Sequence, residues 1–312
     1  MTAGGPRVKA AVFWSFAAIY VVWGSTYLAI RVMVATVPPL LASGSRFLVA
    51  GSLLYGWARS RGVPAPERRL WGPAALMGTL FFVIGNGGVA WAETRIPSGL
   101  TALLAATSPL FTGVIESARG GWRRPPLRVV VGIVLGLGGV ALLVAPGELI
   151  GGGHVDVAGA LVITIAAMSW AAGSVASHAV PLHPSPLLAT GMKMLAGGVL
   201  LVAAGLLFGE GGRIHPATFS PRALLAWGYL VVFGSLIGFS AFTYLLRVST
   251  PQKVSTSAYV NPLVAVALGW VILGETITPR TMIAAAVIVG GVMLIRQGGS
   301  RQGAAIRGIP DP

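Results

Sequence analysis

The stretch PLLASGSRFLVAG, residues 39–51, returns later in the chain as PLLATGMKMLAGG, residues 186–198. The two copies align without a gap, seven of their 13 positions are identical, and Arg46 in the first copy has Lys193 as its mate in the second. Weak internal symmetry of this kind is typical of membrane folds built from two copies of one structural unit. The chain is therefore expected to consist of two related halves.

The same relationship extends beyond these residues. An offset of 147 also pairs Trp23 with Trp170 and Arg31 with His178. After small shifts in the offset, two further matches follow, SPL at 108–110 with NPL at 261–263 and GGV at 138–140 with GGV at 290–292. The duplication thus covers most of the chain.

The composition indicates which solvent surrounds the protein. Hydrophobic residues make up 55% of the 312 positions and charged residues only 10%, whereas a soluble domain carries roughly 25% charged residues. The formal net charge is +14, but the arginines stand in short loops between apolar runs, which is typical of membrane topology and not of a nucleic-acid site. We expect a lipid bilayer around the chain and no nucleic-acid partner. The absence of cysteine excludes disulfides and thiol chemistry.

Ten stretches are long and apolar enough to cross a membrane, which takes about 20 residues each. Pro, Gly and polar residues separate them, and Thr278-Pro279 reads as a helix N-cap followed by proline at the first helical position. The expected fold class is all-α integral membrane with ten transmembrane helices. The predicted spans are 10–34, 39–58, 70–92, 97–118, 127–145, 155–178, 186–208, 222–246, 254–273 and 279–295.

Lys and Arg predict the orientation. With the N-terminus in the cytoplasm, 15 of the 22 basic residues fall in inside loops and tails, 4 fall outside, and Arg31, Arg46 and Lys193 lie within spans. Cytoplasmic loops carry the excess of basic residues in membrane proteins. We therefore expect a multi-pass protein of the cytoplasmic membrane with both termini in the cytoplasm.

Five spans per half is an odd number, so the second half must cross the membrane in the opposite sense to the first. Inverted repeats are a signature of secondary transporters, whose substrate site lies near the bilayer midplane between the halves. The expected organisation is an N-terminal cytoplasmic tail (1–9), a first five-helix repeat (10–146), a second five-helix repeat (154–296) and a C-terminal cytoplasmic tail (297–312).

Several motifs resemble one known family when taken in order. They are WGSTYLAIR at 23–31, Pro38-Pro39, Arg46-Phe47, PSGLTALLAATSPL at 97–110, YVNP at 259–262, LGE at 273–275 and GGV at 290–292. Together, over about residues 10–296, they resemble EamA-like members of the drug/metabolite transporter superfamily. The resemblance implies ten helices in two inverted repeats, a central cavity, and export of small metabolites or drugs, often with proton exchange. One departure is that Gly274-Glu275 has no counterpart after Pro109.

Ionisable side chains inside a bilayer are costly and are candidates for function. Arg46 and its mate Lys193 are candidates for binding an anionic group, with a structural role as the alternative. Glu93 is the first candidate for a titrating carboxyl, with Arg31 or Arg46 as its partner; the alternative is a loop residue paired with Arg95. Glu275 is expected to favour a neighbouring helix start, and Glu210 and Asp156 to be solvated loop residues.

Uncharged polar and aromatic side chains within the apolar runs form the rest of the predicted cavity lining. For each polar residue taken alone, helix–helix hydrogen bonding, worth about 0.6 kcal/mol on average, is the better explanation; as a set they are candidates for cavity lining. Pro109 and Pro262 are expected to break their helices and free backbone carbonyls. The predicted substrate-binding set is Trp23, Ser25, Thr26, Arg46, Asn86, Trp91, Thr107, Ser108, Trp170, Ser174, Lys193, Tyr244, Tyr259 and Asn261.

No catalytic motif accompanies these residues. The chain has no His-Glu-x-x-His, no nucleotide phosphate loop and no clustered acids, so we expect no enzyme activity, no metal and no cofactor. The favoured function is a secondary active transporter that exports small organic molecules by alternating access. An intramembrane enzyme acting on a lipid-like substrate and a passive channel are the alternatives. The solute, the coupling ion, the direction of physiological transport and the oligomeric state are open at this stage.

Overall fold

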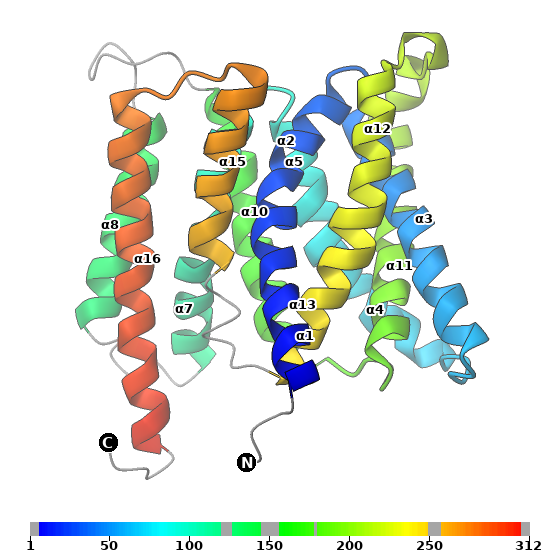
Figure 1. Cartoon of the computed structure of the whole chain (residues 1–312), viewed down its shortest axis with the longest axis horizontal. Helices are drawn as coiled ribbons and strands as arrows, with labels where there is room; N and C mark the ends of the chain where they lie inside the picture. The colour runs from blue at the N-terminus through cyan, green and yellow to red at the C-terminus, as the bar shows by residue number, and fades with distance from the viewer. Residues whose placement is uncertain (1–5, 120–126, 145–155, 178–179, 249–256, 307–312) are drawn as a thin grey trace.

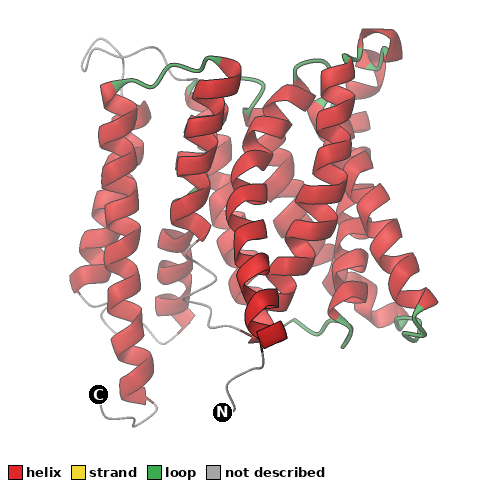
Figure 2. Cartoon of the chain, in the orientation of Figure 1, coloured by secondary structure: helices red, strands yellow, loops and turns green. Residues whose placement is uncertain are grey.

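A computed structural model describes residues 6–119, 127–144, 156–177, 180–248 and 257–306 of the chain. Within these ranges the protein consists of helices joined by short turns and contains no strand (Figure 2). The all-α prediction is confirmed for the described residues. His178 lies outside these ranges.

The described residues before 145 form a series of helices, three of them short π or 3-10 segments. The bounds are α1 (Pro6–Ala17), η1 (Ala18–Val22), α2 (Trp23–Val34), α3 (Pro39–Ser60), η2 (Arg68–Leu70), α4 (Trp71–Gly78), η3 (Thr79–Gly87), α5 (Gly88–Ala92), α6 (Ser98–Ala105), α7 (Ser108–Arg119) and α8 (Leu127–Val144).

The described residues after 155 form a second series. The bounds are α10 (Val157–Ala176), α11 (Pro186–Leu207), η4 (Glu210–Arg213), η5 (Pro216–Thr218), α12 (Pro221–Tyr229), η6 (Leu230–Ile237), α13 (Gly238–Val248), α15 (Ser257–Leu273) and α16 (Pro279–Ile306). The mates Pro39 and Pro186 each begin a helix of 22 residues.

In the part of the chain that the structure describes, six helical stretches are long and apolar enough to cross a membrane, and they coincide with six of the ten predicted spans. They are Ala10–Val34, Arg68–Ala92, Ser98–Ile115, Val157–Ala176, Pro186–Leu207 and Pro221–Phe242. Two shorter apolar helices, Val260–Leu273 and Pro279–Gly291, coincide with two more. The remaining two predicted spans are helical, as α3 and α8, but α3 carries Arg46 and several serines and does not reach the same apolar character.

Local sequence explains where several helices begin. Proline stands in the first turn of α3, α11 and α12, where its missing N–H costs nothing. The hydroxyl of Ser220 accepts a hydrogen bond from the N–H of Ala223 at 3.1 Å. Likewise, Thr278 Oγ1 accepts from the N–H of Thr281 at 3.1 Å, which confirms the predicted N-cap of α16.

Three details differ from the sequence prediction. The fourth predicted span is two helices, because α6 ends at Ala105 and α7 begins at Ser108. The predicted break is thus present just before Pro109, which stands in the first turn of α7, where proline is tolerated. At Pro262 the predicted break is absent, because α15 continues through this residue from Ser257 to Leu273. In addition, α16 continues to Ile306, well past the predicted end at residue 295.

Glycine allows two helix pairs to approach closely. In α11, a Cβ on Gly191 would lie 2.9 Å from the backbone nitrogen of Tyr55, and one on Gly198 would lie 2.9 Å from that of Leu48. Since both partners belong to α3, the two helices pack backbone against backbone along their lengths. The pair α8 and α16 does the same around Gly291 and stands side by side at one edge of the molecule (Figure 1).

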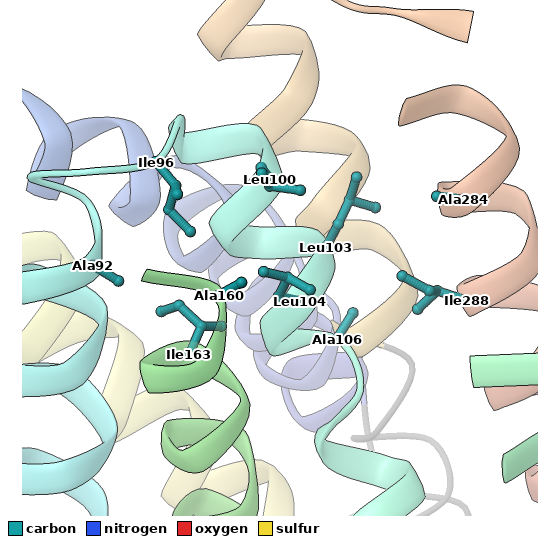
Figure 3. Close-up of a cluster of buried hydrophobic side chains, with 10 residues drawn as sticks. All are labelled: Ala92, Ile96, Leu100, Leu103, Leu104, Ala106, Ala160, Ile163, Ala284 and Ile288. Atoms are coloured by element: carbon teal, nitrogen blue, oxygen red, sulfur yellow. The ribbon is translucent and has the colours of Figure 1, made fainter. Parts of the chain in front are cut away.

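An apolar core surrounds α6. Figure 3 shows Leu103 and Leu104 of α6 beside Ile163 of α10 and Ile288 of α16, all of them buried. Helices from both series therefore share one core. The start of α1 and the end of α16 lie at the same end of the bundle (Figure 1); we call it the terminal end, and the opposite one the distal end.

Candidate functional site

Six aromatic side chains meet where helices of the two series face each other. Trp23 of α2 and Trp170 of α10, which the sequence pairs as mates, lie with ring centroids 6.1 Å apart at 90°. Trp23 also contacts Phe239 at 5.3 Å. We call this set the aromatic cluster; its members are Trp23, Phe47, Phe81, Phe82, Trp170 and Phe239.

Backbone features hold Trp23 in place. Its indole N–H donates to the carbonyl of Gly234 at 3.3 Å. A Cβ on Gly238 would lie 2.4 Å from the same indole nitrogen, so only glycine leaves room for the ring at that position. Both glycines belong to the stretch where the π-helical η6 passes into α13, and π-helical turns occur frequently at functional sites.

Arg46 of α3 lies against the aromatic cluster. Its side chain is 2% exposed, its Nε donates to the hydroxyl of Ser235 at 2.9 Å, and its guanidinium carbon lies 4.5 Å from the centroid of the Phe47 ring. The Nη1 atom is buried and has no hydrogen-bond partner among the described residues. No described carboxylate forms an ion pair with it.

Lys193, the mate of Arg46, reaches the same cluster from α11. Its Nζ lies 5.8 Å from the centroid of the Phe81 ring. The side chain is partly buried. Like Arg46, Lys193 forms no ion pair with a described carboxylate. The structure thus brings both predicted cations to one group of aromatic rings.

Four of the predicted polar residues bond to a nearby backbone carbonyl, three of them within their own helix and Thr107 from the break between α6 and α7. Thr26 donates to the carbonyl of Trp23 at 2.6 Å, and Thr107 to that of Leu104 at 2.7 Å. Ser174 donates to the carbonyl of Trp170 at 2.8 Å. The Nδ2 of Asn86 donates to the carbonyl of Phe81 at 2.9 Å, across the wider turn of η3. These hydroxyl and amide donors already have partners in the protein.

Ser25 and Asn261 make contacts between helices. The hydroxyl of Ser25 lies 2.6 Å from that of Tyr229, which links α2 to α12. With its amide oriented to satisfy its neighbours, Asn261 of α15 donates to the carbonyls of Ile19 and Tyr20 at 3.1 and 3.2 Å. Both residues join the first helix series to the second.

The remaining predicted residues lie apart from the cluster contacts. Trp91 packs at the distal end, where the guanidinium of Arg95 lies 4.5 Å from its ring centroid. Ser108 begins α7, and Tyr244 is partly buried in α13. The side chain of Tyr259 is outside the described part of the structure.

Glu93 occupies the turn between α5 and α6 and is fully buried. Both of its carboxylate oxygens lack a hydrogen-bond partner among the described residues. The predicted partner Arg31 is close, but its guanidinium donates to the backbone carbonyl of Glu93 and not to the carboxylate. Arg95, the alternative partner, pairs instead with Asp156 at 3.3 Å.

The expectation for Glu210 was wrong, and that for Glu275 needs correction. Glu210 is 4% exposed, and its carboxylate accepts the backbone N–H groups of Leu40 and Leu41 at 3.2 and 2.9 Å. Gly209, with φ of +77°, makes the left-handed turn that directs Glu210 onto the start of α3. Exposed as it is, Asp156 accepts the N–H of Gly159 at 2.6 Å as the N-cap of α10, which lowers the pKa of its carboxyl.

Glu275 binds the start of a different helix from the one that follows it. Its carboxylate accepts hydrogen bonds from the N–H and the hydroxyl of Ser98, both at 2.9 Å, and from the N–H of Gly99 at 3.2 Å. Carboxylates are stabilised at helix N-termini by the free N–H groups and the helix dipole. Glu275 therefore caps α6, which is 177 residues away in the sequence.

An apolar groove of about 390 Å³ lies between η3, α7 and α10. Ser169 is its one polar lining residue, and the hydroxyl of Ser169 already donates to the carbonyl of Leu80 at 2.9 Å. The groove holds no charged side chain. The aromatic cluster with its two cations is therefore the better candidate for a polar solute. No three described His, Asp or Glu residues are placed to share a metal ion.

Sequence reasoning missed three residues next to this site. Ser235 hydrogen-bonds Arg46, Tyr229 hydrogen-bonds Ser25, and Phe239 contacts Trp23. All three lie in the eighth predicted span. Phe81 and Phe82, close to Asn86, were likewise missed because apolar rings inside an apolar span carry no distinguishing signal.

Comparison with known proteins agrees with this architecture. The sequence pattern of the EamA-like transporter family matches residues 9–145 and again residues 157–297. The inner membrane transporter YedA of Escherichia coli is 41% identical over 288 residues, covering 92% of this chain and 91% of its own length. A probable amino-acid metabolite efflux pump of Salmonella typhimurium is 26% identical over 88% of this chain and 91% of its own length.

One solved crystal structure has a similar fold, with a TM-score of 0.62 and 24% identity over 94% of this chain and 99% of that one. The family and these relatives are transporters, which confirms the prediction that the chain is not an enzyme. The match of the family pattern to both halves and the 41% identity to YedA assign the chain to a family. The chain is a membrane transporter and belongs to the EamA-like transporter family.

Proposed function

We propose that the chain is a secondary exporter of small organic molecules in the cytoplasmic membrane, working by alternating access between two inverted five-helix repeats, residues 10–146 and 154–296. The substrate would bind at the aromatic cluster, where helices of both repeats meet. Both termini would be cytoplasmic, so the terminal end of the bundle faces the cytoplasm. The Lys and Arg distribution supports this orientation.

The observation that carries the proposal is where carboxylates link the two repeats. All the described links lie at one end of the bundle. All three acids of the second repeat bind the first repeat: Glu210 caps α3, Glu275 caps α6 and Asp156 pairs with Arg95. The ends of the helices that carry these links lie at the distal end of the bundle (Figure 1). Among the five acids whose side chains the structure describes, none joins the repeats at the terminal end.

A transporter that alternates must close one end while the other opens. Capping bonds from a carboxylate are strong when formed and are released together when a helix start moves away. Glu210, Glu275 and Asp156 thus form an outer clasp, which we define by these three residues. The described conformation corresponds to one closed toward the outside.

Proton exchange is the coupling mode that Glu93 supports. It is a buried carboxyl with no described hydrogen-bond partner, beside the cation Arg31 and close to the clasp. The pKa of a carboxyl in such a place differs between the conformation in which its end is closed and the one in which that end is open to water. Protonation would therefore follow the conformational cycle.

Transport against a gradient tests the proposal. Everted membrane vesicles containing the chain are loaded from a panel of radiolabelled amino acids, organic acids, sugars and amphipathic drugs, with and without a proton gradient. We expect at least one solute to accumulate above its external concentration only when the gradient is present. Equilibration without accumulation of every transported solute would indicate a channel and overturn the proposal.

A further inference from the structure

Arg46 is a buried charge without a counter-charge. Long basic side chains in membrane helices commonly extend their charged end to the membrane interface. Arg46 does not, because its side chain is only 2% exposed. Its Nε donates a hydrogen bond to the neutral hydroxyl of Ser235, and its Nη1 has no hydrogen-bond partner in the described residues. An unpaired buried charge is strongly destabilising.

The acids whose side chains the structure describes do not supply the missing charge. Of the five acids with described side chains, Asp156, Glu210 and Glu275 are engaged at the distal end and Glu67 pairs with Arg69 at 2.6 Å. The fifth, Glu93, lies in the turn beside Arg31. None of them forms an ion pair with Arg46 or Lys193.

The duplication keeps a cation at both mate positions. Arg46 faces Phe47, and Lys193 faces Phe81; the ring of Phe82 lies 4.4 Å from Phe47 and 6.5 Å from Phe81. The two cations therefore approach one continuous set of rings, one from each repeat. The close packing of α3 against α11 brings the two cations to this one place.

We propose that the substrate of this site is an organic anion, a carboxylate with an apolar, preferably aromatic, body. The free Nη1 of Arg46 would donate to the carboxylate, since a guanidinium presents its donors in a fixed geometry that matches that group. Lys193 supplies the second positive charge, and the rings of the aromatic cluster contact the body. This inference rests on the proposed function only in taking the aromatic cluster as the transport site.

Matched carboxylate and amide probes test the substrate class without a transport assay. Purified protein in detergent is heated with 3-phenylpropionate or with 3-phenylpropionamide, which has nearly the same shape but no charge. Specific binding raises the midpoint of thermal unfolding. We expect the carboxylate to raise the unfolding temperature. The amide should need a concentration at least about tenfold higher to give the same increase. Sodium chloride and sodium sulfate at equal ionic strength control for inorganic anions.

Three variants at the site and one control variant assign the effect. R46Q and K193Q are expected to weaken the response to 3-phenylpropionate about tenfold or more, whereas R46K retains part of it. R59Q removes an equal charge from the exposed end of the same helix α3 and should leave the response unchanged. Because the buried charge is unpaired, R46Q without probe should unfold at a higher temperature than the wild type.

The outcomes separate this inference from the proposed function. Equal stabilisation by acid and amide, no stabilisation by the acid, a full response from inorganic anions, or an unchanged response in R46Q and K193Q would overturn the anionic substrate class. Accumulation of neutral solutes alone in vesicles would do the same while leaving the exporter intact. Specific binding of the acid with no uphill transport of any solute would leave the anion site standing and remove the exporter.

Discussion

The carboxylate of Glu275 caps the helix that begins at Ser98, accepting both the N–H and the hydroxyl of that residue at 2.9 Å. The contact joins the turn before α16 to the start of α6, across the interface between the two halves of the chain. Gly274, with φ of +66°, makes the turn that precedes Glu275. This link is the most extensively hydrogen-bonded part of the outer clasp.

The first prediction concerns E275Q. An amide cannot accept all three bonds as a carboxylate does, so the closed conformation should lose about 1.5–3 kcal/mol and the open one gain population. The natural chain contains no cysteine, so a single T101C reporter, buried one turn into α6, reports opening directly. Labelling by a membrane-impermeant maleimide from the outside should speed up about tenfold or more.

The control for this variant is E67Q, which removes the same kind of group from an exposed local pair. It should leave the labelling rate of T101C unchanged. If E275Q also left the rate unchanged, the contact would be a passive cap and not part of a gate.

The second prediction uses Gly269 of α15, which lies beside the Glu275 side chain. A Cβ there would lie 2.3 Å from Glu275 Oε2 and 3.1 Å from Ser98 Oγ. G269A should therefore displace the carboxylate and speed up T101C labelling although Glu275 itself is intact. G228A, in α12, adds the same methyl group where nothing lies within 4 Å and should have no effect. Equal rates for both variants would mean that the carboxylate simply shifts and keeps its bonds.

The third prediction concerns the close packing of α3 and α11. G191A places a methyl group 2.9 Å from the backbone nitrogen of Tyr55, which cannot rotate away. We expect the free energy of unfolding to fall by about 1–3 kcal/mol, measured by thermal or detergent-induced unfolding. G56A, on the exposed side of α3 with nothing within 4 Å, should be neutral or stabilising by up to about 1 kcal/mol. A stable G191A would show that the two helices separate easily.

The sequence alone predicted those parts of the fold that depend on local signals. Apolar runs of sufficient length marked the helices, and Thr278-Pro279 marked the start of α16 correctly. The duplication paired Trp23 with Trp170 before any contact between them was known. By contrast, α6 and α7 were read as one span, because the apolar character continues through the break at residues 106–107.

Contacts between helices were harder to predict. The partners Arg46 and Ser235 are separated by 189 residues, and their meeting depends on how each helix is rotated about its axis. In a soluble helix the apolar face reveals that rotation, but a helix that faces lipid on one side and protein on the other is apolar all round. Glu210 and Glu275 stand in polar turns, where a carboxylate is ordinary. Their positions in the sequence therefore gave no sign of the helix starts that they cap.

The fourth prediction concerns Glu93 and pH. It follows the span Arg68–Ala92 and precedes Ser98–Ile115. Burial raises the pKa of its carboxyl well above the usual 4.5, while the charge of Arg31 lowers this pKa and that of Glu275 raises it. The folded protein thus holds this proton more tightly than the unfolded chain does. The stability that results is complete below about pH 4.5 and is lost as the pH rises toward the folded-state pKa.

E93Q keeps the shape of the side chain but cannot lose a proton. Its unfolding temperature should fall less than that of the wild type as the pH is raised from about 5 to about 8, and E67Q should follow the wild type. Parallel curves for E93Q and the wild type would mean that the Glu93 carboxyl ionises at an ordinary pH despite its burial.

The fifth prediction separates coupling from translocation with the same variant. If Glu93 carries the exchanged proton, E93Q should still exchange labelled for unlabelled solute across a vesicle membrane, because that half-cycle needs no net proton movement. Accumulation driven by a proton gradient should be lost, since the permanently neutral amide cannot carry a proton in one direction only. E210Q, which alters the clasp but leaves Glu93 in place, should retain gradient-driven accumulation at a changed rate. Gradient-driven accumulation by E93Q at the wild-type level would assign coupling to another group, whereas loss of both activities would make Glu93 a structural residue of the distal end.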